Sequence, residues 1–409
     1  MTTDDAAVAE DSVPTHEELD ESSQELDDEI SLPVPEELEG EPTPLSEELI
    51  NDELAKEPFA APDPVESDTV ADEQCRARLA AAVARGDDTV SCASWRTSAA
   101  VAELRAAVGA WPTPDWCGED GVDGKWHVTR FKACGVFAAD LKVHDARTGR
   151  LVGSMTYLIR AYAYSKRDIK TWAYQVELME VTSSGEAKGA SVSGSSRCAG
   201  KCKVTESTFP SQTMSVNKEA VGQFFLDTTI KTTPKGDKGE GQATAVWRFN
   251  RAGWAGPSND IILPTPPVRC DNAVPGTSKT GCVMPYIPSM AYAKAGEYPE
   301  LAKHIEYAQN TLNLPGKHGT KRYLTRLTDK IKIRANRTKA CPQNLPRLPG
   351  QQCDEYPMAS TWQGAEHGGG DYSRRMINGW QNEEGGKALG RFYLYNRIIE
   401  KDKFLVWIK

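Results

Sequence analysis

All ten cysteines of this chain lie between residues 75 and 353, and none lies in the first 74 residues. An even number of cysteines spread through a folding region favours disulfide bonds and an oxidising compartment. The spacings suggest sequential pairs, and Cys270–Cys282 and Cys341–Cys353 are each twelve residues apart. Spacing alone leaves the full connectivity open. The chain is therefore expected to fold as a disulfide-bonded body behind a cysteine-free leader.

The segment Cys198-Ala-Gly-Lys-Cys202 also has a spacing found in zinc sites. A structural zinc site needs four ligands, yet no second cysteine pair of this kind follows and no histidine lies near. A disulfide is therefore the stronger interpretation of these two residues.

The first 73 residues hold 26 of the 58 acidic residues and a single basic residue, Lys56. They are rich in Glu, Asp, Pro and Ser, and no aromatic residue occurs before Phe59. Such a segment cannot bury enough apolar surface to offset its ordering entropy, which predicts a disordered acidic tail over residues 1–73. Residues 74–409 then hold 47 Lys and Arg against 32 Asp and Glu, a net charge of +15. A basic body suggests a polyanionic partner, with ordinary surface charge as the alternative.

The middle of the chain changes from a helical to a strand-like pattern. Residues 75–110 contain two runs of good helix formers and are expected to be helical. Beyond them, short apolar runs alternate with segments of turn-forming residues. Five or more strands at this spacing predict an antiparallel sandwich or barrel within a domain over residues 74–265. The predicted strands begin at Trp126, Leu151, Thr171, Gly222 and Ala243.

Pro264-Thr-Pro-Pro267 marks a boundary, after which residues 270–409 form a second predicted domain. Pro299–Leu312 reads as one amphipathic helix, because apolar residues recur at steps of three and four. His304 lies beside that apolar stripe, and a buried position in the core is a stronger interpretation than catalysis.

The run from Lys317 to Lys339 carries nine basic residues against one acid, Asp329. It is a candidate phosphate-contacting surface, with a merely solvated basic face as the alternative. The predicted nucleic-acid contacts are Lys317, Lys321, Arg322, Arg326, Lys330, Lys332, Arg334 and Arg337.

The segment most informative about chemistry follows Cys353 and places two carboxylates, Asp354 and Glu355, before Tyr356-Pro357. Its flanks are apolar or small, which favours at least partial burial. If the chain is extended here, the two side chains point to opposite faces, so we expect them to have different roles.

Several ordered motifs in this region resemble the NucA/NucB family of secreted bacterial deoxyribonucleases, over about Tyr286 to Lys409. The helix segment Tyr298-Pro-Glu-Leu-Ala-Lys-His-Ile resembles one element of that family, and Leu324-Thr-Arg-Leu-Thr-Asp resembles its middle region. The remaining motifs are Cys353-Asp-Glu-Tyr-Pro, the Ala-Ser-Thr that follows it, Gln381-Asn382 with a following Gly, and Leu389-Gly-x-Phe-Tyr-x-x-x-Arg397.

The resemblance implies a compact ββα-metal core and a role for each of three residues. It implies Asp354 as the general base, at the position that a histidine fills in related nucleases. It implies Asn382 as the residue that holds the catalytic cation, and Glu355 as a second carboxylate that positions metal, water or neighbours. Carboxylate and amide oxygens suit Mg²⁺, Mn²⁺ or Ca²⁺, of which Mg²⁺ or Mn²⁺ is the expected cofactor.

The chain departs from the family at Gln363-Gly364, where the family usually has Glu-Gly. Glutamine keeps an acceptor oxygen but loses the charge, which would weaken activity if that Glu helps to bind metal or tune the base. Glu366 and Glu383 lie close in sequence as candidate replacements. Arg391 and Arg397 are candidate phosphate contacts, although a structural or surface role is the stronger interpretation of each.

The sequence thus predicts an α+β protein, in which a ββα-metal-type nuclease domain follows a mainly antiparallel β domain and a disordered tail. The expected function is a secreted, metal-dependent, non-specific endonuclease that hydrolyses phosphodiester bonds of DNA, with RNA as a further substrate. One alternative is a nuclease effector at the end of a delivered toxin, which would need an immunity or inhibitor protein as partner. The other is a catalytically decayed protein that binds nucleic acid or the cell envelope.

The N-terminal sequence shows no signal peptide, because it has neither a basic n-region nor an apolar core. The prediction of secretion therefore depends on the cysteines. No apolar run reaches the roughly 18 residues of a membrane span, so no span is expected.

Overall fold

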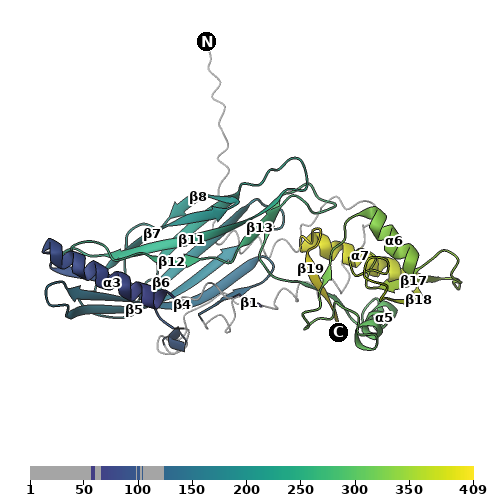
Figure 1. The fold of residues 1–409 in the computed structure, drawn as a ribbon, viewed down its shortest axis with the longest axis horizontal. Coiled ribbons are helices and arrows are strands. Elements are labelled where there is room, and N and C mark those ends of the chain that lie inside the picture. The colour runs from purple at the N-terminus through teal and green to yellow at the C-terminus, as the bar shows by residue number, and fades with distance from the viewer. Residues whose placement is uncertain (1–56, 60–65, 98, 102–103, 105–123) are drawn as a thin grey trace, which may run out of the picture. The chain divides into compact units, whose positions relative to one another are not determined.

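The computed structural model describes residues 57–59, 66–97, 99–101, 104 and 124–409, shown as coloured ribbon in Figure 1. These residues belong to one compact unit that spans Pro42–Lys409. The architecture is α+β overall and mostly antiparallel β, with few helices. The predicted α+β class with a mainly antiparallel β part is confirmed. The predicted domain boundary near residues 265–270 stays a prediction.

The largest sheet has eight strands among the described residues. They are β1 (Glu57–Phe59), β2 (Thr89–Trp95), β3 (Trp126–Val128), β4 (Lys132–Asp145), β5 (Leu151–Tyr164), β6 (Thr171–Gly185), β8 (Cys202–Thr208) and β10 (Ala220–Thr228). Their order is β1-β3-β4-β5-β6-β10-β8, and β2 pairs with β4. All five strands predicted from the alternation after Trp126 are present, four of them here and the fifth in the second sheet.

The second sheet has the order β14-β13-β11-β7-β9, with β12 beside β11. Its strands are β7 (Ser191–Gly200), β9 (Gln212–Thr213), β11 (Lys238–Asn250), β12 (Ile261–Pro264), β13 (Val268–Asp271) and β14 (Gly281–Val283). Buried side chains of both sheets form one hydrophobic core. Within it the Tyr157 and Phe249 ring centroids are 5.0 Å apart, and Trp247 Nε1 donates to Tyr157 Oη at 3.4 Å. The two sheets therefore form a sandwich, one of the two predicted arrangements.

The segment predicted to be helical from residue 75 to 110 contains a strand. Helix α3 (Glu66–Arg85) is present and begins inside the segment predicted to be disordered, but Thr89–Trp95 forms β2. Both faces of β2 are covered, since Val90 and Cys92 pack with residues of α3 while Trp95 enters the sandwich core. Burial on both faces removes the apolar–polar alternation that marks a strand. Strand β1 (Glu57–Phe59) also lies in the segment predicted to be disordered. The other residues of the predicted tail and most of the predicted second helix lie outside the described residues.

The C-terminal part of the chain builds a separate hydrophobic cluster from helices and short strands. Its elements are β15 (Ser289–Tyr292), α5 (Pro299–Asn310), β16 (Leu324–Thr325), α6 (Lys330–Ala340), β17 (Gln351–Tyr356), β18 (Ser373–Asn378), α7 (Gly379–Tyr395) and β19 (Lys403–Ile408). The predicted helix from Pro299 and the predicted final strand are both present. None of the helices in the described part of the chain is long and apolar enough to cross a membrane.

The cysteines pair in sequence order wherever the structure describes both partners. The disulfides are Cys75–Cys92, Cys198–Cys202, Cys270–Cys282 and Cys341–Cys353. Cys198 and Cys202 thus form a disulfide, in agreement with the preference over zinc. Cys341–Cys353 joins the end of α6 to β17, directly beside the predicted acid pair.

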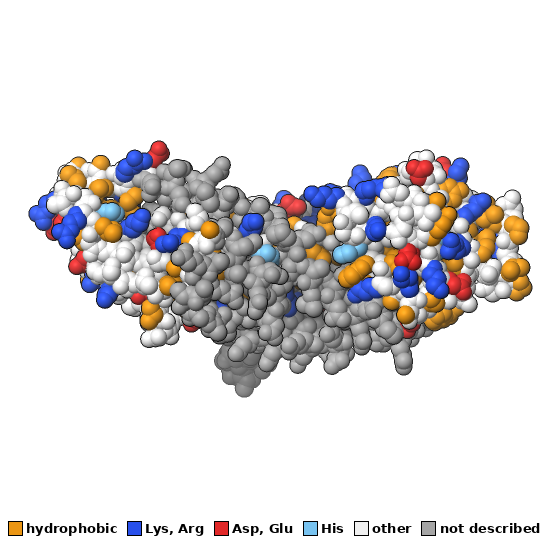
Figure 2. Space-filling view, turned by 90° about the horizontal axis from the view of Figure 1, so that it is seen from below, with side chains coloured by type: hydrophobic (Ala, Val, Ile, Leu, Met, Phe, Trp, Pro, Cys, Tyr) orange, Lys and Arg blue, Asp and Glu red, His pale blue; other side chains and the backbone are white. Residues whose placement is uncertain are grey.

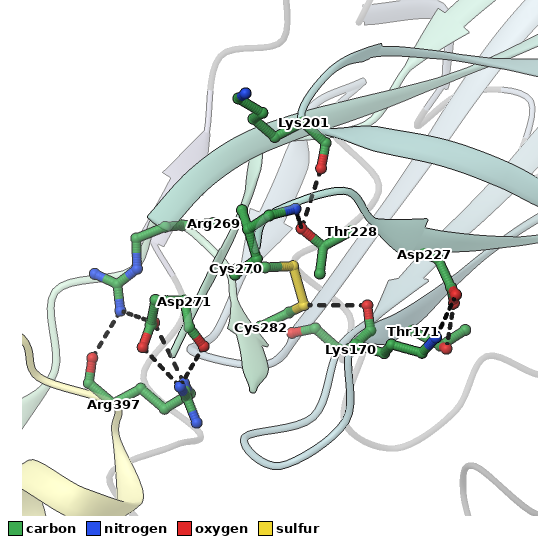
Figure 3. The surroundings of a disulfide bond; sticks show 12 residues. Lys170, Thr171, Lys201, Asp227, Thr228, Arg269, Cys270, Asp271, Cys282 and Arg397 are labelled. Atoms are coloured by element: carbon green, nitrogen blue, oxygen red, sulfur yellow. Dashed lines mark hydrogen bonds and ion pairs between the residues drawn. A yellow bond between two sulfur atoms is a disulfide. The ribbon is translucent and has the colours of Figure 1, made fainter. Parts of the chain in front are cut away.

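A buried ion cluster joins β13 to the segment after α7, as Figure 3 shows. Arg397 is 1 % exposed, and its Nη2 donates to Asp271 Oδ1 and to the Asp271 backbone oxygen, each at 2.6 Å. Arg269 Nη2 donates to Asp271 Oδ2 at 3.2 Å and to the Arg397 backbone oxygen at 2.7 Å. Arg397 therefore has a structural role, which agrees with the stronger of its two interpretations.

We expect Arg397→Ala to lower the free energy of unfolding by about 3–5 kcal/mol, because it leaves a fully buried carboxylate with too little compensating charge. Urea denaturation measures the change. Arg147→Ala is the matched control, since Arg147 pairs with Asp88 on the surface and exposed pairs contribute little. Equal effects of the two substitutions would contradict the assigned role.

Candidate active site

The predicted site residues lie on a β-hairpin that leads directly into a helix. β17 pairs antiparallel with β18, and α7 begins at Gly379, immediately after β18 ends. The side chain of Asn378 caps α7 by accepting a hydrogen bond from Gln381 N at 3.2 Å. Asp354 and Glu355 lie on β17, and Asn382 lies in the first turns of α7.

The alternation of β17 sorts its side chains onto two faces. Tyr356 Oη accepts a hydrogen bond from Gln309 of α5 at 2.9 Å, and Asp354 contacts the same helix. Glu355 lies instead toward α6, where Arg337 Nε is 4.0 Å from its Oε1. The expectation that the two carboxylates face different surroundings is thus met by the geometry.

Asp354 is paired with a buried histidine. Its Oδ2 lies 2.5 Å from Nδ1 of His304, and Nε2 of the same ring lies 2.9 Å from Ser373 Oγ. His304 is fully buried, and the Asp354 side chain is 10 % exposed. Burial raises the pKa of Asp354, and the hydrogen bond from His304 opposes this shift. The three side chains form a continuous polar chain within an otherwise apolar cluster.

Glu355 occupies a second buried position close to the Cys341–Cys353 disulfide. Its Oε2 lies 3.6 Å from Cys341 Sγ. Burial and the neighbouring Asp354 raise the pKa of Glu355 to about 8, and Arg337 opposes them. Without a bound cation, Glu355 is therefore mostly protonated at neutral pH.

Asn382 is held against β17 from the opposite side. Its Nδ2 donates to Gln352 Oε1 at 3.1 Å and to the Cys353 backbone oxygen at 3.4 Å. Gln352 Nε2 in turn donates to the carboxylate of Glu383. With Nδ2 occupied in this way, Oδ1 of Asn382 is the atom that can face a cation.

The start of α7 is fixed by α5 through reciprocal hydrogen bonds. Glu300 Oε2 accepts from Asn378 N, and Gln381 Oε1 accepts from Glu300 N, each at 2.8 Å. Farther along α7, a Cβ at Gly385 would lie 2.2 Å from Leu301 Cδ2 of α5. Glycine costs about 1 kcal/mol in a helix interior, yet here it permits the close approach of the two helices. This packing sets the position of Asn382 relative to Asp354.

The donor set fits a hard divalent cation in its chemistry. Asn382 offers an amide oxygen and Glu383 an exposed carboxylate, and oxygen ligands of this kind suit Mg²⁺ or Mn²⁺. Glu355, which the sequence paired with Asn382 as a ligand, lies on the face of β17 opposite to Gln352, and its role as a second ligand stays a prediction. Within the described residues, no group of three or more His, Cys, Asp or Glu side chains is arranged to hold a metal ion.

The other predicted supporting residues lie in different surroundings. Gln363 binds the strand β16, because its Oε1 accepts from Thr325 N at 2.8 Å. Glu366 is exposed on the loop that follows. Arg391 is partly buried, and its Nη2 is among the buried side-chain atoms for which no partner occurs in the described structure. None of these contacts joins the three residues to Asp354.

The predicted nucleic-acid contacts lie in the loop before β16, at Arg326 directly after β16, and in helix α6. Six of the eight are exposed, and the other two cover aromatic rings, Arg326 over Tyr393 at 3.8 Å and Lys332 over Trp362 at 4.5 Å. Figure 2 shows Lys and Arg side chains scattered over the end of the drawn face that holds α5–α7. The exposed residues are Lys317, Lys321, Arg322, Lys330, Arg334 and Arg337.

Helix α6 is anchored to the segment that follows β17 by a buried asparagine. Asn336 Nδ2 donates to the backbone oxygens of Ala359 and Thr361, and its Oδ1 accepts from the amides of Glu366 and His367. Together with the Cys341–Cys353 disulfide, these bonds hold the basic helix in a fixed position beside the acid pair.

Sequence reasoning placed His304 correctly in the core but missed its contact with Asp354. The periodic pattern of α5 shows only that the residue is near the apolar stripe. The available signal was the family-like Pro-Glu-x-Ala-x-His-Ile element, which marked this histidine together with the acid-pair motif.

An acid pair on a hairpin, beside a basic helix, is a site suited to a polyanionic substrate. The family model for deoxyribonuclease NucA/NucB matches residues 314–407, the C-terminal region, as the resemblance predicted. No curated protein matches the chain. The match supports a nuclease, which is a hydrolase with a nucleic-acid substrate. It includes Asp354, Glu355 and Asn382, whereas α5 lies before the matched range.

We expect the stability of the cation-free protein to fall as the pH rises from 5 to 9, in part because of Glu355. A carboxyl group whose pKa is higher in the folded state stabilises the fold below its unfolded pKa, and this contribution is lost as the pH rises through the folded value. Each pH unit in that window changes the free energy of unfolding by at most about 1.4 kcal/mol.

Urea denaturation of wild type and Glu355→Gln in EDTA tests this expectation. The two proteins should be similarly stable near pH 5, and the variant should become the more stable one by pH 8. A constant difference across the range would show that Glu355 does not carry the raised pKa.

Proposed function

We propose that this protein is a metal-dependent endonuclease that hydrolyses phosphodiester bonds of DNA through its C-terminal ββα unit. The observation that carries the proposal is Asp354, a buried and oriented carboxylate on the hairpin that leads into the helix of Asn382. Both residues lie inside the range that matches the nuclease family. The hairpin and helix have the strand–strand–helix order expected of a ββα-metal core.

In this proposal Asp354 is the general base. His304 binds one carboxylate oxygen, and the other accepts a proton from a water molecule aligned with the scissile bond. The basic residues of α6 bind the flanking phosphates and orient the backbone. They are fixed relative to Asp354, because the disulfide and Asn336 anchor α6 to β17 and to the segment that follows.

Asn382, with Glu383 beside it, is the proposed holder of the cation. A bound divalent cation would neutralise charge that develops on the phosphate and on the leaving oxygen. Asn382 keeps its amide oxygen oriented because Gln352 and the Cys353 backbone bind its nitrogen.

The disulfides support an extracellular or otherwise oxidising location. Four are present in the described structure, and one of them lies next to Asp354. A secreted nuclease would keep this bond, which fixes α6, in its oxidised form.

We expect the oxidised full-length protein to nick supercoiled plasmid in millimolar Mg²⁺ or Mn²⁺ and to leave it intact in EDTA. Asp354→Ala should lower the rate by about 10²–10⁴-fold, the usual contribution of a general base. The matched control is Asp371→Ala, which removes an exposed carboxylate from the loop before β18. Gel electrophoresis of the plasmid measures all three proteins.

Equal cleavage by the three proteins would reject Asp354 as the base. Intact plasmid in every lane together with retained DNA binding would favour the catalytically decayed alternative, and Gln363→Glu would then be the variant to compare.

We expect the double variant Lys330→Ala/Arg334→Ala to weaken DNA binding to a similar degree for every sequence. Each lost phosphate contact lowers the slope of log affinity against log salt by about 0.9, so the double change lowers it by up to about 1.8. Fluorescence anisotropy in EDTA, in the Asp354→Ala background, measures binding without cleavage.

The control for this measurement is Lys188→Ala/Lys218→Ala, which removes two exposed lysines from connections between strands of the sandwich. An equal loss of slope in both double variants would mean that α6 is not a preferred phosphate-binding surface.

A further inference from the structure

His304 has no role in the proposed reaction, yet its ring joins Asp354 of β17 to Ser373 of β18. It is fully buried on α5, among Leu301, Ile305 and Ala308, which all belong to the hydrophobic cluster. Burial of an imidazole in such surroundings is unfavourable unless both ring nitrogens find partners. Both do, and one partner is the carboxylate proposed as the general base.

The hydrogen-bond chemistry fixes a direction along this chain. An ionised carboxylate can only accept, so Nδ1 of His304 donates to Asp354 Oδ2. In the neutral imidazole Nε2 is then an acceptor, and the Ser373 hydroxyl donates to it. The serine lies on β18, so the chain of bonds runs from one strand of the hairpin through α5 to the other strand.

We propose that His304 is a positioning residue, which holds Asp354 so that its second oxygen, Oδ1, faces the attacking water. The proposal rests on the proposed nuclease function and adds a residue outside the range matched by the family model. The alternative is a histidine that only fills space in the core. A space-filling residue needs no particular nitrogen beside Asp354, whereas a positioning residue needs a donor at the place of Nδ1.

Two substitutions of nearly equal size separate the two roles. In His304→Asn the side-chain nitrogen takes the place of Nδ1 and can still donate to Asp354. In His304→Gln the amide reaches the place of Nε2 and can contact Ser373 but no longer donates to Asp354. Both leave a small cavity and a polar amide in the core. A histidine that only fills space therefore predicts similar losses of stability and of kcat for the two variants.

The test measures kcat and KM for plasmid cleavage by the full-length protein, with thermal unfolding as a check of folding. We expect His304→Asn to retain most of the wild-type kcat and His304→Gln to lose about 10–100-fold, as removal of an outer-shell partner usually does. KM should stay unchanged, because the ring lies below the surface and contacts no substrate. Equal kcat values for the two variants would overturn the proposal.

Ser373→Ala and a spectroscopic readout cover the case in which neither histidine variant folds. The serine variant removes only the hydroxyl that orients the ring, so a lower kcat at unchanged KM supports the proposal, and an unchanged kcat contradicts it. In the wild-type protein, ¹⁵N chemical shifts should show a proton on Nδ1 of His304. A neutral ring protonated at Nε2 would reject the proposal even if the protein shows no nuclease activity, so this failure differs from failure of the proposed function.

Discussion

The arrangement of the C-terminal site depends on the extended conformation of β17. Because successive side chains of a strand point to opposite faces, two adjacent carboxylates are separated by the thickness of the strand. Asp354 lies against α5 beside His304, and Glu355 lies toward α6 beside Arg337. One strand thus supplies a carboxylate held by a hydrogen-bond donor on one face and a carboxyl group with a pKa of about 8 on the other.

The two carboxylates also differ in what compensates their burial. Asp354 receives a hydrogen bond at 2.5 Å, which favours its ionised form against the effect of burial. The source of positive charge near Glu355 is Arg337, an exposed arginine whose Nε lies 4.0 Å from the carboxyl. A buried carboxyl without close compensation stays protonated, so the physical chemistry of the site favours Asp354 as the group that accepts a proton.

The sequence predicted much of this organisation, and its errors have physical causes. The helix from Pro299 was predicted because one of its faces is apolar, and the acid pair because of its motif. The strand Thr89–Trp95 was missed because both of its faces are covered, which erases the alternation that reveals a strand. The contact of His304 with Asp354 joins residues 50 positions apart, and no local pattern encodes such a distance.

The predicted metal ligands also depend on contacts that no local sequence pattern encodes. The family-like pattern suggested Asn382 and Glu355 as metal ligands, which stays a prediction, and the alternation of β17 places Glu355 on the face opposite Gln352, which Asn382 contacts. Glu383, which the sequence offered only as a replacement for the charge missing at Gln363, lies beside Asn382 through Gln352. The order of residues along β17 therefore puts Gln352 and Asp354 on one face of the strand and Glu355 on the other.

Helix α7 is held at both ends by other parts of the chain. At its start, Glu300 of α5 binds Asn378. After its end, Arg130 donates to the backbone oxygen of Asn396 at 2.7 Å, and Arg269 donates to the backbone oxygen of Arg397. Positive charge is favourable where a helix leaves its carbonyl groups unpaired.

The two guanidinium groups of Arg130 and Arg269 are costly to bury together. Burial and the neighbouring Arg269 lower the pKa of Arg130 to about 9, so these groups need Asp402 and Asp271 nearby. The residues that carry this charge, Arg130 and Arg269, belong to the β-sheet part of the chain, so that part helps to fix the helix on which Asn382 lies.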